Sequence, residues 1–170
     1  MNAILARGVM NCDAWRAGDS IAILALSSTP TRTDFGPDTG TTVECRVCLQ
    51  PERPCVVGRA DGTHVPYLAE GYRSSPIVPT SGVAILWGGG CSHDKYVSRA
   101  HFMLRAVAGG ILFVNGVPGR DGNLRPPPNV TYMLEPNVRP FGAGEEHWVG
   151  PGLALLIRLP NWLQIRIQAG

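Results

Sequence analysis

The fold is decided by the stretch from Tyr96 to Leu104, which reads Tyr-Val-Ser-Arg-Ala-His-Phe-Met-Leu. Apolar residues alternate along it, as they do in a strand whose successive side chains point to opposite faces. One predicted face carries Ala100, Phe102 and Leu104, and the other carries Arg99, His101, Met103 and Arg105. The stretch therefore predicts a strand that is preceded by a loop containing Ser98.

Two other segments place polar groups at the end of a predicted strand. Cys55 to Gly58 is an apolar run followed by Arg59, and Gly119 to Asn123 is a turn with its own arginine and asparagine. Loops at strand ends are exposed and well held, so polar side chains there can meet a ligand without the cost of burial. Together with the loop at Ser98, three loops thus each offer a partner for an anion or an amide.

Gly-Arg at a strand end, then Ser-Arg-x-His, then a turn of glycine and asparagine, is the order of motifs in forkhead-associated (FHA) domains. This sequence resembles that family, over roughly residues 43 to 167. The resemblance implies an all-β, FHA/SMAD-like β-sandwich whose loops at one end hold a phosphothreonine peptide.

By this resemblance, five residues would bind the phosphopeptide. Arg59 would clamp two phosphate oxygens, because a guanidinium group can fork onto a phosphate. Ser98 would donate its hydroxyl and its backbone N–H to a phosphate oxygen, and Arg99 and Arg120 would add positive charge. Asn123 would hydrogen-bond the peptide backbone beside the phosphothreonine.

Two further residues would have structural roles. Gly58 ends the strand before the clamp, and His101 matches a buried histidine that holds the family's loops by hydrogen bonds. The dipeptide Asn115-Gly116 competes with Asn123 as the peptide-binding asparagine, since Gly122-Asn123 reverses the family's usual Asn-Gly order.

The composition agrees with one mostly β domain. The chain has 170 residues, of which 44% are hydrophobic and only 16% charged, with 21 Gly and 15 Pro. These numbers favour turns and strands over long helices. The net charge of +2 is too small to indicate nucleic-acid binding. The sequence has no apolar run of about eighteen residues that could span a membrane, and we expect a cytoplasmic protein.

We expect about ten or eleven strands. Residues 1–42 would be an N-terminal extension packed on the sandwich, and residues 43–170 the sandwich itself, with an insertion at about 60–95. Alternation predicts a hairpin of residues 43–50 and 55–58 around Pro51–Pro54. Further strands are predicted at 21–26, 83–87, 111–114 and 130–134, with a closing hairpin of residues 153–159 and 162–167.

Other residues invite enzymatic or metal-binding interpretations. Cys45-x-x-Cys48 has the spacing of a zinc or redox motif, but residues three apart on a strand point to opposite faces. One loose cluster contains Cys91, His93, Asp94 and His101, and another contains Glu145, Glu146 and His147. No nucleophile elbow, Walker loop or His-Glu-x-x-His motif accompanies them, so we predict no enzyme, metal or cofactor.

The sequence thus predicts a module that binds phosphothreonine on a partner protein, the substrate of a Ser/Thr kinase, with neither nucleic acid nor membrane as partner. Two alternatives remain open. One is an FHA-like structural or assembly module that has lost phosphate binding. The other is a metal- or thiol-dependent enzyme.

Overall fold

The structure, a computed structural model of the chain, describes residues 20–27, 42–51, 54–59, 83–87, 94–119 and 121–170. In these ranges it has thirteen strands and one short 3-10 helix, η2 (Asp94–Tyr96), and no α-helix. The predicted all-β fold is confirmed. The excess over ten or eleven strands comes from two-residue strands, which are too short to show an alternating pattern.

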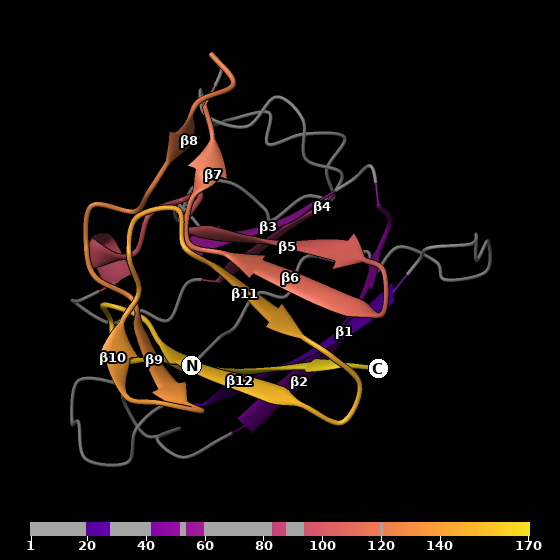
Figure 1. The fold of residues 1–170 in the computed structure, drawn as a ribbon. Coiled ribbons are helices and arrows are strands. Elements are labelled where there is room, and N and C mark those ends of the chain that lie inside the picture. The colour runs from indigo at the N-terminus through magenta and orange to yellow at the C-terminus, as the bar shows by residue number, and fades with distance from the viewer. Residues whose placement is uncertain (1–19, 28–41, 52–53, 60–82, 88–93, 120) are drawn as a thin grey trace.

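The strands form two main sheets and a small ribbon, which Figure 1 shows as two layers with the ribbon at the top of the view. The six-stranded sheet has, in order, β10 (Arg139–Pro140), β9 (Tyr132–Glu135), β12 (Ala154–Arg158), β13 (Gln164–Ala169), β1 (Ser20–Ser27) and β2 (Thr42–Leu49). The five-stranded sheet has β11 (Glu146–Val149), β6 (Gly110–Val114), β5 (Phe102–Val107), β3 (Cys55–Arg59) and β4 (Val83–Trp87). The ribbon pairs β7 (Val117–Pro118) with β8 (Leu124–Arg125).

One hydrophobic core joins the two main sheets. In β12 the alternate residues Leu155 and Ile157 are fully buried, and in β5 so are Phe102 and Leu104. An aromatic row runs through this core: the ring centroids of Phe102 and Phe113 are 5.0 Å apart, and those of Phe113 and Phe141 are 4.7 Å apart. Burial of one face of each sheet explains the alternation seen in the sequence.

The other face of the five-stranded sheet also carries buried residues. Val56 is the register partner of Met103, which is the partner of Val114, and these residues are 1%, 6% and 1% exposed. They alternate with the core residues of their own strands and lie outside the main core cluster. The centre of this sheet is therefore buried on both faces, which fits the apolar runs of β3 and β6.

One predicted hairpin is wrong. The chain does form strands at 42–49 and 55–59, but β2 pairs with β1 in the six-stranded sheet, whereas β3 pairs with β4 and β5 in the other. Pro51 to Pro54 therefore belongs to a connection between sheets. A sandwich connection and a hairpin turn use the same turn-forming residues, so local sequence does not distinguish them.

The remaining predicted strands are found at β1, β4, β6 and β9, and β12 and β13 form the predicted closing hairpin. Residues 20–27 of the expected N-terminal extension lie inside the six-stranded sheet, between β13 and β2. Within the expected insertion, β4 runs parallel to β3. The rest of both regions, including Cys91 and His93, lies outside the described residues. In the described part of the chain, no helix has the length and hydropathy to cross a membrane.

Replacing the central core aromatic gives a test of the fold. Phe113 is fully buried between Phe102 and Phe141, so Phe113→Ala should lower the free energy of unfolding by about 3–5 kcal/mol through the cavity it leaves. Denaturant unfolding measures this loss. The control is Val138→Ala at a site that is 77% exposed, which should change stability by less than about 0.5 kcal/mol. Equal stability of the two variants would contradict the assigned core.

Candidate functional site

Strand pairing in the five-stranded sheet places the ends of three strands at one end of the sheet. Val57, near the end of β3, is the register partner of Phe102 at the start of β5, and Val114 at the end of β6 is the partner of Met103. Antiparallel pairing therefore puts the backbone of Arg59, the loop before β5 and the segment after β6 at the same end of the sheet. The three segments that the sequence singled out leave from this end.

Gly58 lies directly against the loop before β5. A Cβ atom added to it would overlap the carbonyl group of Arg99 and would lie 2.8 Å from the carbonyl oxygen of Ser98. Only glycine allows two backbone segments to approach this closely. The glycine before Arg59 thus fixes the end of β3 against Ser98 and Arg99.

His101 locks the same loop from the inside. It is fully buried, and its backbone N–H donates to the carbonyl oxygen of Val57 at 2.9 Å. Its Nδ1 accepts the backbone N–H of Ser98 at 3.1 Å, so the ring proton is on Nε2, which lies 2.7 Å from Oγ1 of Thr131. Burial lowers the pKa of His101 to about 3, so the imidazole is neutral.

Only some of the predicted phosphate ligands lie in the described part of the structure. The backbone N–H of Ser98 is used by His101, while its half-buried hydroxyl has no hydrogen-bond partner among the described residues. Arg99 is exposed, and Arg59 is the last residue of β3 with a side chain outside the described part of the structure. Arg120 also lies outside the described residues. Of the Ser98 donors, the hydroxyl is therefore the one left for a ligand.

Asn123 lies in the exposed turn of the β7–β8 ribbon and is held by Asp121. Its backbone N–H donates to Oδ1 of Asp121 at 3.1 Å, and its Nδ2 donates to Oδ2 at 3.2 Å. These bonds hold the pKa of the Asp121 carboxyl below its usual value. Arg125 lies 3.4 Å from the same carboxylate. The turn thus has a fixed shape while remaining accessible.

Asn115, the competing asparagine, is a structural residue. It is 4% exposed, and its Nδ2 donates to the carbonyl oxygen of Gly142 at 2.9 Å. Its backbone N–H donates to the carbonyl oxygen of Glu145 and its own carbonyl oxygen accepts from Gly144. Asn115 therefore holds the β10–β11 turn, and Asn123 is the exposed asparagine of the pair.

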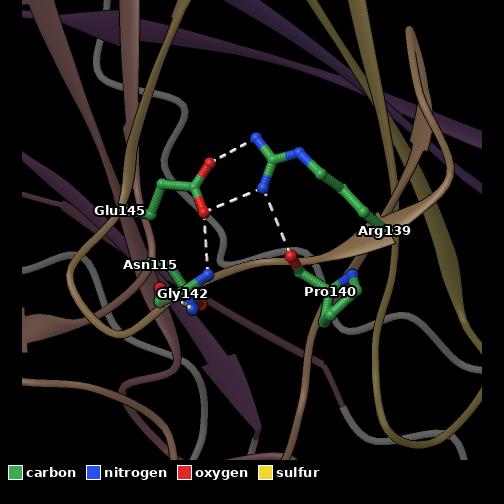
Figure 2. A network of polar contacts seen from close by, with 5 residues as sticks. All are labelled: Asn115, Arg139, Pro140, Gly142 and Glu145. Atoms are coloured by element: carbon green, nitrogen blue, oxygen red, sulfur yellow. Dashed lines mark hydrogen bonds and ion pairs between the residues drawn. The ribbon is translucent and has the colours of Figure 1, made fainter.

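A bidentate ion pair between Arg139 and Glu145 spans the same turn, as Figure 2 shows. The Arg139 guanidinium pairs with both oxygens of Glu145, with its Nη1 2.9 Å from Oε2, and Oε2 also accepts the backbone N–H of Gly142 at 2.8 Å. The hydrogen bonds from Arg139 lower the pKa of the Glu145 carboxyl. Glu145 is thus occupied by its own chain, and the cluster of Glu145, Glu146 and His147 has no free pair of carboxylates for acid–base chemistry.

Two contacts connect the β7–β8 ribbon and the segment that follows it to other loops of the chain. Leu124 packs on Gly144, where an added Cβ would lie 2.5 Å from Cδ2 of the leucine. Further along, Nδ2 of Asn129 donates to the carbonyl oxygen of Tyr96 at 2.9 Å. Neither Asn129 nor Thr131 stands out in the sequence. An asparagine and a threonine after three prolines carry no local signal that they bind a loop thirty residues earlier.

Comparisons with known proteins found a solved structure that is similar to this chain. No family model matches the chain, and no curated protein matches it. The solved Rv0020c FHA structure aligns with 91% of this chain and 97% of its own, at 18% sequence identity and a TM-score of 0.37. The motifs in the sequence resemble the FHA family.

The close approach at Gly58 gives a prediction for the stability of the chain. Gly58→Ala should lower the free energy of unfolding by about 2–3 kcal/mol, because the new Cβ meets rigid backbone and not a movable side chain. Chemical denaturation measures the loss. The matched control is Gly142→Ala, whose Cβ would meet Oε2 of Glu145 at an ordinary 3.4 Å and should cost much less. Comparable stability of the two variants would contradict the contact.

The neutral, buried imidazole gives a pH dependence. The unfolded chain binds a proton at His101 below pH 6.5, whereas the native chain does not until about pH 3. Stability from this group is therefore complete above pH 6.5 and falls as the pH is lowered, by at most about 1.4 kcal/mol per pH unit.

Two measurements check this dependence. The NMR signals of the His101 ring should stay constant from pH 7 to pH 5, and unfolding free energies should fall over that interval. Burial also lowers the pKa of His147, so the fall should be measured in His147→Gln as well. A His101 ring that titrates near pH 6.5 in the native state would disprove the assignment.

Proposed function

We propose that this chain is an FHA-like module that binds a phosphothreonine-bearing segment of a partner protein and carries out no catalysis. The observation that supports it most is the contact of Gly58 with the backbone of Ser98 and Arg99. This contact brings the Gly-Arg end of β3 next to the Ser-Arg loop. A guanidinium and a hydroxyl that start from adjacent backbone can reach the same phosphate.

In the proposed mechanism, the phosphate is bound by charge-assisted hydrogen bonds. Arg59 forks onto two oxygens, the hydroxyl of Ser98 donates to one, and Arg99 and Arg120 add charge. Asn123 hydrogen-bonds the peptide backbone beside the modified threonine. The neutral state of His101 suits this role, since its Nδ1 accepts the hydrogen bond that the Ser98 N–H donates and the ring needs no counter-ion.

A partner of this kind is the substrate of a Ser/Thr kinase, so binding would follow phosphorylation. We expect phosphothreonine to bind better than phosphoserine if a pocket receives its methyl group. In this proposal the protein works in the cytoplasm.

An assembly module without phosphate binding is the second candidate. One observation favours it: one N–H of the Asn123 amide already donates to Asp121, and that carboxylate lies in the proposed peptide-binding turn. A fixed negative charge beside a dianion is unfavourable, although Arg125 partly compensates it. Such a module would use an edge strand for its contacts.

Titration with a library of phosphothreonine peptides distinguishes the two. Arg59→Ala or Ser98→Ala should weaken phosphate-dependent binding about tenfold or more, because each removes a charge-assisted hydrogen bond. Arg105→Ala is the control, since this exposed arginine lies in β5 away from the three loops. Calorimetry of phosphorylated and unphosphorylated pairs measures the effect. Equal binding of both forms, or binding that neither site variant changes, would favour the assembly module.

A further inference from the structure

Arg158 is held between two aromatic rings at the end of β12. The carbon at the centre of its guanidinium lies 4.9 Å from the ring centroid of Tyr132 and 4.4 Å from that of Trp162. The neighbouring residues Ile157 and Leu159 are buried in the core, so Arg158 lies on the outer face of the six-stranded sheet. Cation–π contacts with two rings restrict the position of the guanidinium in advance of any binding.

Trp162 has an uncommon backbone conformation. It has a φ of 69° in the turn from β12 to β13, where its N–H donates to the carbonyl oxygen of Leu159 at 2.9 Å. Glycine or asparagine usually occupies such a position, because a large side chain is strained there. The indole is nonetheless 37% exposed. A strained and partly exposed tryptophan that orients a cation points to a binding role rather than a packing role.

The charge of Arg158 is available to a ligand. No carboxylate among the described residues pairs with it, whereas Arg166 on the same face lies 3.2 Å from Oε2 of Glu135. The N–H groups of a guanidinium lie in its plane and point outward from its edge, so contacts with aromatic rings do not satisfy them as hydrogen-bond donors. A half-buried, oriented fork of this kind matches the geometry of a carboxylate.

A short chain of contacts connects this arginine to the proposed phosphate site. Tyr132, which stacks on Arg158, follows Thr131, and the hydroxyl of Thr131 is bonded to His101. His101 in turn holds the N–H of Ser98. The aromatic pair and the Ser98 loop therefore belong to the same end of the sandwich.

We propose that Arg158, Tyr132 and Trp162 form a second anion-recognition point, which binds an acidic side chain of the same phosphopeptide. This inference rests on the proposed function and gives it a specificity: the partner carries Asp or Glu near its phosphothreonine. Tyr132 and Trp162 are positioning residues, and Arg158 makes the contact.

A peptide comparison tests the inference on the full chain. Phosphothreonine peptides that carry one Glu at each flanking position in turn are compared with the same peptides carrying Gln. The wild-type chain should prefer one Glu peptide by about fivefold, as expected for a partly exposed ion pair. Arg158→Gln should remove the preference, and Arg158→Lys should keep only part of it, since lysine lacks the fork.

Two variants separate binding from structure. Arg166→Gln removes a charge from the same face and should leave the preference unchanged. Trp162→Gly should reduce the preference without loss of thermal stability, because glycine adopts the positive φ freely. Unchanged affinity for the Gln peptides shows in each case that the variant is folded.

The outcomes distinguish this inference from the function on which it rests. Phosphate-dependent binding without a Glu preference in the wild type, or a preference that survives in Arg158→Gln, overturns the second recognition point alone. Absence of phosphate-dependent binding to every peptide overturns the proposed function and this inference with it.

Discussion

The contact between Gly58 and the backbone of Ser98 and Arg99 is the constraint on which this end of the molecule depends. Backbone meets backbone there, so no side chain can be inserted on β3 at that point. His101 completes the arrangement by binding the carbonyl oxygen of Val57, the N–H of Ser98 and the hydroxyl of Thr131. Because His101 and Thr131 are fully buried, these hydrogen bonds hold the loop from within the core.

The charged groups of the structure fall into two classes according to their partners. The charges of Glu145 and Asp121 are taken up by arginines of the same chain, and these pairs shape the β10–β11 turn and the β7–β8 ribbon. Arg158 differs because its neighbours are aromatic rings and not acids. An arginine satisfied by a carboxylate stabilises the chain's own loops, whereas one that is only stacked keeps its hydrogen-bond donors for a partner.

The strand pattern was predicted well wherever one face of a strand is buried. The alternation of Phe102 and Leu104, and that of Leu155 and Ile157, marks positions that fill the core. Prediction failed where the alternation was too short, as in β7, β8 and β10, and where pairing depended on distant partners. The segments on either side of Pro51–Pro54 are both strands, but their hydrogen bonds go to different sheets.

The candidate site, too, is predicted only in part by the sequence. Sequence motifs singled out Gly58, Ser98 and His101, and the structure joins these three residues by direct contacts. Motifs alone leave both Asn115 and Asn123 as candidates for the peptide-binding asparagine. Burial separates them, since Asn115 is enclosed by the β10–β11 turn while Asn123 is exposed in the ribbon. Nothing local marked Thr131 or Trp162, whose roles come from neighbours remote in the chain.

The sequence by itself determined the all-β class and the chemical groups at three strand ends, because both follow from the order of residues within about ten positions. The tertiary structure decided which strands pair, which asparagine is buried and which arginine is stacked between rings. Those outcomes depend on packing between segments that are far apart in the chain, and the free energy of such packing is not encoded in any single local pattern.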